Sequence, residues 1–547
     1  MKFEDKLKNY TQEEIWQEYC GFLDLSLSEY MQIQRRLLME QIALLSSCDL
    51  GKRLFKGRKI ESVDDFRRFV PLTTYDDYAD ILLLNKEEML PAKPVVWLKT
   101  TWEGGNHPSK TAPYSAAMLD TYKNNIISAM ILSTSTTKGK FRVTPGARVL
   151  YALAPMPYAT GLFPGLIDSE ISLQFMPSIK EAKSLSFSQQ TKKGFELSLR
   201  YGMDMFFGMS SILTGISHSI AAMTSGSGKI SLKSLAKLSP KMLYRIVSAR
   251  YRSKRDGKPV LPKDIFQLHG FVCVGTDSAL YKDELEELWG CRPLEIAGGT
   301  EPSCLGTETW SKNGLVFFPD NCFYEFIPES EMLRGIDDKT YIPKTYLMDE
   351  LAPNCNYELV ITVLKGGAFA RYRVGDVYRC LRVKNPSDGL DIPQFEYVDR
   401  VPTVIDIAGF TRITERVIQD VIRLSRLQIS DWFALKEYNE NNHSFMHLYA
   451  EMDESCTDSS AISRQLIMEH LGAYFRFYDK DYSDLKRLLG ADPLKVTILR
   501  TGSIRTFREK YSRSIPKINP PLFDIVDITR ISEGLGQIDG EEDLRCQ

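Results

Sequence analysis

The segment LKTTWEGGNHPSKTAPYS, residues 98–115, has the residue types of a phosphate-binding loop. It is a polar turn after an apolar run, with small hydroxyl residues, glycines and one basic side chain: Thr100, Thr101, Gly104, Gly105 and Lys110. Backbone amides, hydroxyls and a lysine together can hold a phosphate group. Trp102 and Glu103 stand where Gly and Thr would be expected. A carboxylate facing inward would repel a triphosphate, so we expect Glu103 to point away from the loop.

The segment PLEIAGGTEPSCLG, residues 293–306, reads as a buried strand that ends in Gly298 and Gly299. Glycines let the backbone approach a flat ligand closely, and a carboxylate just beyond them can bind Mg²⁺ directly or through water. Thr300 and Glu301 are the residues in that place. A glycine-rich strand end with a capping threonine explains the same residues equally well.

The segment GAFARYRVGDVYRC, residues 367–380, is predicted to be a strand with Arg371 and Arg373 on one face. Tyr372 is expected on the other face, and Gly375 with Asp376 is expected to form a tight turn. An aspartate in such a turn can accept two hydrogen bonds from a vicinal diol such as ribose. The alternative is an Asx turn on a strand whose outer face is charged.

A third strand, NCFYEFIPE at 321–329, is aromatic and could form one wall of an adenine pocket. Strands of this composition are more often part of a core, because aromatic side chains are favoured in buried sheets. Residues 150–220 are apolar and rich in Met and Phe, which predicts a pocket for an apolar or aromatic acid.

The segments that must position these residues alternate in type. Apolar residues at helical spacing predict a helical layer over 9–50, ending at Gly51. Thr74 or the Asp76–Asp77 pair is placed to cap a further helix. From about 95 to 410, β-rich runs alternate with helical stretches, which predicts an α/β sheet domain. Residues 408–547 predict a smaller α+β unit, with a hairpin over 431–452 and a helix around 460–475.

Composition limits the function classes. A net charge of -2 over 547 residues gives no electrostatic reason to bind nucleic acid or an anionic membrane. The basic run at 229–263 has helical spacing and is interpreted as one or two helices with a solvated lysine face. No apolar run approaches the ~20 residues of a membrane span. The cysteines are scattered singly and no signal peptide is evident, so we expect a cytoplasmic protein with reduced thiols and, as the simplest state, a monomer.

The order and spacing of these segments resemble those of the Gretchen Hagen-type acyl-acid amido synthetases. This family is a branch of the adenylate-forming superfamily that includes firefly luciferase. The resemblance covers nearly the whole chain and is carried by FRRFVPLTTYDDY, FYEFIP, YELVITVLKGGAFARYRVGDV, PQFEYVDR, HLYAEM and PLKVTILRTGS, which follow one another in register.

The resemblance implies a fold and an activity. It implies a large N-terminal adenylate-forming domain of packed β-sheets and helices over 1–400, which binds ATP and the acyl acid. A small mobile α+β domain over 401–547 would rotate between two half-reactions. The implied enzyme uses ATP and Mg²⁺ to convert a small carboxylic acid into an acyl-adenylate, then transfers the acyl group to an amine, usually an amino acid.

The resemblance also implies roles for residues of the large domain. Asp376 matches the aspartate that binds the ribose hydroxyls. Glu301 matches a glutamate assigned to Mg²⁺ and the phosphates, and Gly299 and Thr300 replace the two serines before it. Tyr324 lies at an adenine-side position in the aromatic strand. The loop at 98–115 would keep a phosphate role through Thr100, Thr101 and Lys110.

Three further residues are implied near the small domain. Arg400 falls at the junction about which that domain turns. Arg412 lies near a family lysine. The family ends with a lysine two residues before a proline, whereas Lys517 here precedes Pro520 by three residues. Lys517 would take the lysine's catalytic role after a local shift, or Lys110 and the arginines would act instead.

Two alternatives remain open at this point. One is a ligase that forms a thioester with coenzyme A or a carrier-bound thiol. The other is a nucleotide-binding scaffold that has lost turnover, which the altered 98–115 loop and the displaced lysine favour and the intact RYRVGD and GGTE segments oppose.

Overall fold

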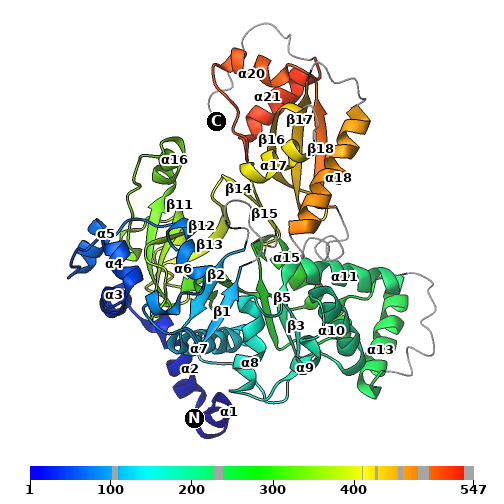
Figure 1. Ribbon diagram of the computed structural model, residues 1–547. Helices are drawn as coiled ribbons and strands as arrows, with labels where there is room; N and C mark the ends of the chain where they lie inside the picture. The colour runs from blue at the N-terminus through cyan, green and yellow to red at the C-terminus, as the bar shows by residue number, and fades with distance from the viewer. Residues whose placement is uncertain are drawn as a thin grey trace. The chain divides into compact units, whose positions relative to one another are not determined.

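The computed structural model describes residues 1–100, 107, 109–225, 238–276, 278–409, 411–425, 429–453, 460–478 and 492–534. The chain divides into two compact units, described separately (Figure 1). Unit 1 comprises Met1–Thr101 and Ser109–Val401, and unit 2 takes in Pro402–Gln547. No helix in the described ranges is both long enough and apolar enough to cross a membrane.

The helices of unit 1 begin with an N-terminal layer and then alternate with strands. They are α1 (Phe3–Asn9), α2 (Gln12–Cys20), α3 (Leu27–Ser46), α4 (Asp49–Phe55), α5 (Val63–Phe69), α6 (Ala79–Leu82), α7 (Ala116–Ser133), α8 (Phe163–Asp168), α9 (Ile179–Ala182), α10 (Phe187–Tyr201), α11 (Ser210–Ser225), α13 (Pro240–Asp256), α14 (Pro262–Ile265), α15 (Ser278–Trp289) and α16 (Glu329–Asp337).

The strands of unit 1 form a hairpin and one large sheet. The hairpin pairs β1 (Val96–Lys99) with β2 (Thr111–Tyr114). The sheet contains β3 (Arg148–Ala152), β4 (Gln174–Met176), β5 (Met205–Met209), β6 (Gly270–Val274), β7 (Leu294–Gly299), β8 (Ser303–Glu308), β9 (Leu315–Phe317), β10 (Cys322–Pro328), β11 (Cys355–Val363), β12 (Tyr372–Arg382) and β13 (Gln394–Arg400).

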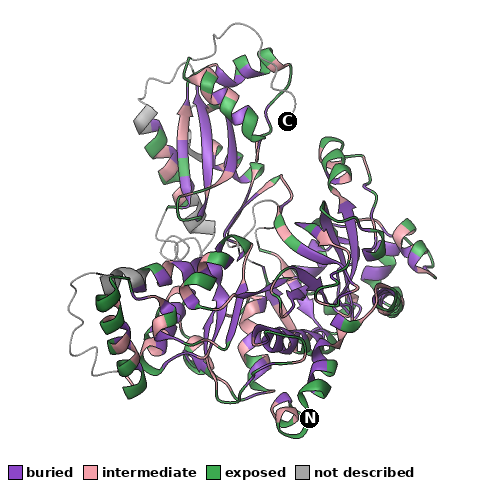
Figure 2. Ribbon diagram, turned by 180° about the vertical axis from the view of Figure 1, so that it is seen from behind, coloured by how far each residue is buried: buried purple, intermediate pink, exposed green. Residues whose placement is uncertain are grey.

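The large sheet has 11 strands in the order β10-β11-β12-β13-β9-β8-β7-β6-β5-β3-β4. The neighbours from β4 through β3, β5 and β6 to β7 are parallel, and the pairs from β7 to β10 are antiparallel. The sheet strands are largely buried, because helices cover them (Figure 2). α7 packs on β6, β7 and β8 and is buried over most of its length, as expected for a helix within the core. The α/β class predicted from the sequence is confirmed.

Unit 2 has its own sheet and its own core. Its strands and helices are β14 (Val404–Ile407), β15 (Thr411–Thr414), α17 (Glu415–Ser425), β16 (Ile429–Tyr438), β17 (Ser444–Met452), α18 (Ser460–Tyr478), β18 (Leu494–Leu499), α20 (Ser503–Tyr511) and α21 (Leu522–Ser532). The predicted hairpin is β16–β17, and β18 joins β17 in parallel. Phe433, Phe507 and Ile528 are among the fully buried residues of its core.

The predicted end of the N-terminal helix was wrong. The N-terminal helix does not end at Gly51: α3 ends at Ser46, and Gly51 lies inside α4. A Cβ at Gly51 would lie 1.9 Å from the Leu45 carbonyl oxygen, so glycine is needed for close packing rather than as a stop. Thr74 does precede a short helical turn, Tyr75–Asp77, with the Asp77 carboxylate accepting from the Thr74 N–H at 2.8 Å.

The predicted turn at Gly375 and Asp376 is a bulge within β12. Glu358 of β11 pairs with Val377, but the next paired residue, Val360, lies opposite Arg373. Three residues of β12 therefore face one residue of β11, and Gly375 adopts φ +81° to accommodate them.

Candidate functional site

The β1–β2 hairpin brings two predicted phosphate-loop residues together. The Thr100 N–H donates to the Lys110 carbonyl at 3.0 Å, and the Lys110 N–H donates to Thr100 Oγ1, also at 3.0 Å. These reciprocal bonds extend the β1–β2 pairing by one residue and fix Thr100, which is buried. Thr101 and residues 102–106 lie outside the described residues, so the roles expected for Thr101 and Glu103 stay predictions.

The end of β7 lies against this hairpin. Thr300 Oγ1 donates to the Lys99 carbonyl at 3.4 Å, and the Tyr114 hydroxyl donates to the Thr300 carbonyl at 2.6 Å. Gly298 and Gly299 are exposed at the strand end. A Cβ at Gly298 would lie 2.4 Å from the Ser303 carbonyl oxygen, so no side chain can cover the backbone there. The carboxyl ends of parallel strands in α/β sheets are the usual place for ligands.

Glu301 is buried beside this open strand end. Its Oε1 accepts from the Tyr372 hydroxyl at 3.0 Å. Burial raises the pKa of Tyr75 to about 12, and the negative charge of Glu301 adds to that rise. The ammonium of Lys110 lies 5.7 Å from the centre of the Tyr75 ring. Thr100, Lys110, Thr300 and Glu301 are therefore one cluster, lined by Tyr75, Tyr114 and Tyr372.

The cluster fits a Mg²⁺ ion that is shared with a substrate. Among the described residues, no group of three or more His, Cys, Asp or Glu side chains could hold a metal ion. Mg²⁺ usually keeps several waters and is held by one or two carboxylates together with substrate phosphates. A single buried carboxylate such as Glu301 could hold the ion in that way.

Asp376 and Arg400 form a second, separate pair. They lie opposite each other on β12 and β13, and Arg400 Nη1 is 2.9 Å from Asp376 Oδ1. The same nitrogen donates to the Val374 carbonyl at 2.6 Å, within the bulge. Arg400 thus neutralises Asp376 and holds the bulged backbone. A carboxylate has about four acceptor positions, so one ion pair is compatible with further hydrogen bonds to hydroxyl groups.

Tyr324 does not offer a ring to a ligand. It is buried in the core, and its hydroxyl donates to the carbonyls of Leu305 at 3.2 Å and Phe318 at 2.9 Å. Its ring packs on Phe317 with a centroid distance of 5.1 Å. The strand is a core strand in this structure, which is the commoner role of aromatic strands.

The arginines of the RYRVGD segment do not form a charged outer face. Arg371 is only 6% exposed, has φ +48° and precedes β12. Its guanidinium makes a bidentate pair with Glu325, at 2.9 and 2.8 Å. Arg373 pairs in the same way with the buried Glu358, at 2.7 and 2.6 Å. These fork-to-fork pairs let Arg371 be buried and Arg373 be half-buried, which a sequence pattern does not reveal.

Arg412 and Lys517 belong to unit 2 and pair within it. Arg412 Nε lies 3.2 Å from Asp406 Oδ1, across the β14–β15 pair, and Asp406 is fully buried. The Lys517 ammonium pairs with Asp431 and donates to the Trp432 carbonyl at 3.1 Å. These contacts hold the segment after α20 against β16.

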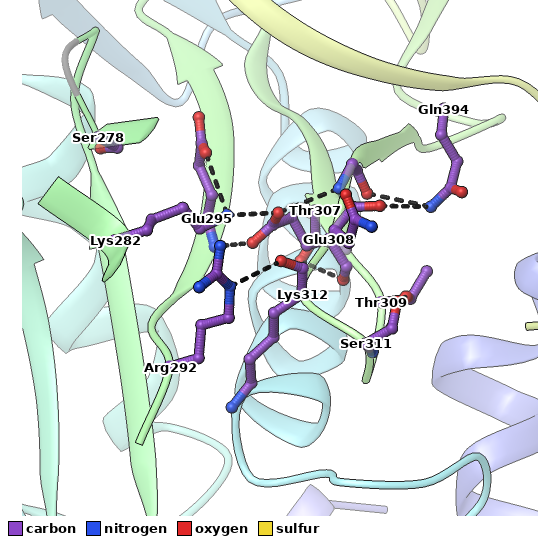
Figure 3. A network of polar contacts seen from close by, with 12 residues as sticks. Ser278, Lys282, Arg292, Glu295, Thr307, Glu308, Thr309, Ser311, Lys312 and Gln394 are labelled. Carbon is purple, nitrogen blue, oxygen red and sulfur yellow. Dashed lines mark hydrogen bonds and ion pairs between the residues drawn. The ribbon is translucent and has the colours of Figure 1, made fainter. Parts of the chain in front are cut away.

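Below the strand end, a buried ionic network holds β7 to its neighbours (Figure 3). The Lys282 ammonium lies 2.5 Å from Glu308 and 3.5 Å from Glu295. The second oxygen of Glu308 accepts from the Glu295 N–H at 2.8 Å, and its first also accepts from the Gly314 N–H at 3.2 Å. The Glu308 carboxylate thus joins α15, β7 and β8. Its partner on β7, Glu295, lies four residues before Gly299.

Sequence reasoning missed the three tyrosines that line the cluster. Tyr372 was expected only as the uncharged face of a strand, and no role was expected for Tyr75 or Tyr114. A signal existed: Tyr75 and Tyr372 both lie in segments that carry the family resemblance.

Comparisons with known proteins agree with this architecture. Residues 21–153 match the GH3 family N-terminal domain and residues 315–400 match the GH3 family central domain. A probable indole-3-acetic acid-amido synthetase GH3.11 of Oryza sativa subsp. japonica is 29% identical over 122 residues. That match covers 22% of this chain and only 20% of the rice protein.

Two solved structures share the fold over most of both chains. AtGH3.15 acyl acid amido synthetase in complex with 2,4-DB is 15% identical with a TM-score of 0.51, covering 93% of this chain and 94% of that one. A 2-hydroxyisobutyryl-CoA ligase in complex with 2-HIB-AMP and CoA is 14% identical with a TM-score of 0.53, covering 87% of each chain. The chain thus shares its fold with these two ligases, and its residues 21–153 and 315–400 are similar to the N-terminal and central domains of the GH3 family.

Proposed function

We propose that this protein is an ATP-dependent ligase that joins a carboxylic acid to an amine, with an amino acid as the amine. The observation that carries the proposal is the cluster at the end of β7. There Thr100, Lys110, Thr300 and Glu301 lie together beside exposed glycines, within a fold shared with adenylate-forming enzymes. The names of the similar proteins add support for amide formation.

The chemistry divides into two displacements. In the first, a carboxylate oxygen attacks the α-phosphorus of ATP, the bond to the bridging oxygen breaks, and pyrophosphate leaves. In the second, the amine nitrogen attacks the acyl carbon, AMP leaves with the bonding electrons, and the nitrogen loses its proton. A free acid and amine would only form an unreactive salt, so adenylation supplies the good leaving group that amide formation needs.

The cluster at β7 would act on the phosphates. The ammonium of Lys110 would neutralise charge that develops on them, while the exposed backbone of Gly298 and Gly299 lets the nucleotide approach. Mg²⁺ bound through Glu301 would supply Lewis-acid stabilisation of the same charge. Positioning the acid in line with the leaving group accounts for much of the expected acceleration.

The Asp376–Arg400 pair would bind the ribose. Arg400 fixes the carboxylate on the bulge, so Asp376 can accept from the ribose hydroxyls without losing its charge. We further propose that unit 2 turns about the segment next to Arg400 between the two steps, as the domain expected over 401–547 would. For Lys517 to reach a phosphate, its pair with Asp431 must open.

We also propose a monomer in the cytoplasm. All eight cysteines within the described residues are free thiols, which suits a reducing compartment. Size-exclusion chromatography with light scattering would test the monomer.

The decisive experiment is ATP–pyrophosphate exchange with a panel of apolar and aromatic acids. Exchange that requires both an acid and Mg²⁺ would support adenylation, and mass spectrometry after adding amino acids or coenzyme A would identify the acceptor. Glu301→Gln and Asp376→Asn should each lower exchange by about a hundredfold. Asp349→Asn, an exposed change in unit 1, is the matched control and should be neutral.

Other outcomes would change the assignment. Thioester products with no amides would make the protein a thiol-acyl ligase. ATP binding without pyrophosphate release from any acid would favour a scaffold without turnover.

A further inference from the structure

Helix α13 (Pro240–Asp256) lies at the outer edge of unit 1 and presents two very different faces (Figures 1 and 2). One face is part of the core: Met242, Ile246 and Ala249 are buried among the residues of the large hydrophobic cluster. Because this face is packed in the core, α13 cannot leave the folded protein to be enclosed by a binding partner. Only its outer face is available for contacts.

The opposite face carries an exposed apolar stripe. Tyr244 is 74% exposed, Tyr251 71% and Val247 54%, and Leu243 is exposed beside them. At 3.6 residues per turn, these four positions fall within an arc of about 100°. Single exposed apolar residues are ordinary on a protein surface, but four in a row along one helix mark a contact surface.

Basic side chains border the stripe on both sides. On the same helical projection, Arg250 lies at one edge with Lys254 just inside it, and Arg255, Lys241 and Arg252 lie beyond the other edge. Arg255 pairs with Asp256, the acidic residue of this helix. The protein as a whole has a net charge of -2, so this positive charge is a local feature of α13 rather than an average property.

The sequence interpretation, a helix with a solvated lysine face, is therefore incomplete. A solvated face needs no tyrosine and valine side chains at its centre. An apolar stripe between two rows of basic residues is the pattern of a helix that lies in the plane of a lipid surface. The apolar side chains enter the headgroup region while lysine and arginine contact anionic lipids.

We propose that α13 is a docking face for an anionic lipid surface, through which unit 1 binds membranes reversibly. A convex helix at the edge of the molecule can meet a flat surface along its whole stripe, whereas a groove would be needed to hold a peptide. The contact would be peripheral, because only side chains of one helical face enter the lipid. This inference does not depend on the proposed ligase activity.

The test uses the full-length protein and cosedimentation with lipid vesicles. Vesicles of phosphatidylcholine with about 30% phosphatidylserine should bind the protein at low ionic strength, whereas pure phosphatidylcholine should not. Binding to the anionic vesicles should weaken as salt is raised. The double variants Tyr244→Ser with Tyr251→Ser and Arg252→Glu with Lys254→Glu should each lower the partition coefficient at least about tenfold.

Matched controls keep the test specific to α13. Ile342→Ser and Lys59→Glu change equally exposed apolar and basic residues elsewhere on unit 1 and should leave partitioning unchanged. Circular dichroism and thermal unfolding would show that every variant is folded.

Several results would overturn the proposal. These are absence of binding to anionic vesicles at low salt, or binding that the α13 variants do not reduce. If the stripe instead supports self-association, seen by sedimentation velocity and lost in the tyrosine variant, or binds only soluble acidic polypeptide, the surface serves a protein and not a lipid.

Discussion

Arg371, a single buried charged residue, holds the segment that leads to the candidate site. Besides its pair with Glu325, Nη1 donates to the Val70 carbonyl at 2.7 Å and Nη2 to Thr345 Oγ1 at 3.2 Å. Thr73 pairs with Tyr372 next to it, and the Thr73 N–H donates to the Arg371 carbonyl at 2.9 Å. The residue therefore holds the start of β12, and with it Tyr372, against the segment around Val70.

Replacing Arg371 by methionine should lower the free energy of unfolding by about 3 kcal/mol, because the buried Glu325 would lose its bidentate partner and keep only the longer contact with Arg67 at 3.5 Å. Denaturant unfolding of the variant measures this. The control is Arg36→Met, which removes an exposed ion pair with Glu40 and should cost less than about 1 kcal/mol. Equal effects at both sites would show that the Arg371 pair does not stabilise the fold.

Tyr372 lies between this anchor and Glu301. We expect Tyr372→Phe to raise the Mg²⁺ concentration needed for half-maximal pyrophosphate exchange by about tenfold, since a hydrogen bond to a charged group is lost. Saturating Mg²⁺ should restore most of the rate. Kinetic titration with Mg²⁺ provides the measurement.

Tyr324→Phe is the matched control for that prediction. It removes a hydroxyl that is equally buried but bonded to two carbonyls of the core. We expect lower stability with an unchanged Mg²⁺ requirement. A shift in Mg²⁺ requirement for Tyr324→Phe and none for Tyr372→Phe would reverse the assigned roles.

At the scale of elements, the Lys282–Glu295–Glu308 network joins α15, β7 and β8 (Figure 3). One ammonium serves two carboxylates. The pKa of Glu295 is raised to about 7. Burial is the main cause, and the charge of Glu308 adds to it, while the positive charge of Lys282 acts in the opposite direction. β7 thus carries a carboxyl group that resists ionisation at one end and the candidate ligand-binding glycines at the other.

The raised pKa predicts how stability varies with pH. Between the ordinary pKa of 4.5 and about 7, the folded state holds more protons at Glu295 than the unfolded state. Stability from this group is therefore present at low pH and lost as pH rises towards 7. Glu295→Gln should remove this dependence of the free energy of unfolding on pH. The free energy of unfolding of the variant minus that of the wild type should therefore increase by about 1–3 kcal/mol from pH 5 to pH 8.

Denaturant unfolding of both proteins across that range would measure the difference. Glu40→Gln, at an exposed position, should show the same pH profile as wild type. A constant difference between Glu295→Gln and wild type at all pH values would mean that Glu295 is ionised throughout.

At the scale of the whole molecule, the two units have separate hydrophobic cores. Leu285 and Phe206 belong to a core cluster of unit 1, whereas Phe433 and Phe507 belong to that of unit 2. Units with their own cores can unfold as separate cooperative transitions.

Calorimetry should therefore show at least two transitions. Phe507→Ala should lower the melting temperature of one and Leu285→Ala that of the other, with losses of about 3–5 and 2–5 kcal/mol for the affected unit. A single transition that both variants shift equally would show that the units unfold together.

The sequence was sufficient for the elements and their order. The β-rich runs between about 95 and 410 predict the strands of the large sheet, because they are bounded by turn residues. The hairpin β16–β17 followed from alternation around a polar turn. The resemblance to a family followed from motifs in fixed order. The proximity of Asp376 to Arg400, in contrast, could be recognised only from the register of β12 and β13.

What the sequence alone determined is the α/β class, the two-part organisation of the segments and the resemblance to a family. These depend on local periodicity and on the order of residues, both of which can be read directly from the sequence. The tertiary structure alone decided that Arg371 is buried, that Arg373 pairs with a buried glutamate, that Tyr324 lies in the core, that Tyr372 holds Glu301 and that α13 exposes an apolar stripe. Each of these features depends on contacts between residues that are far apart in the sequence. The pattern of a single segment does not show which distant residues it will contact or how deeply it will be buried.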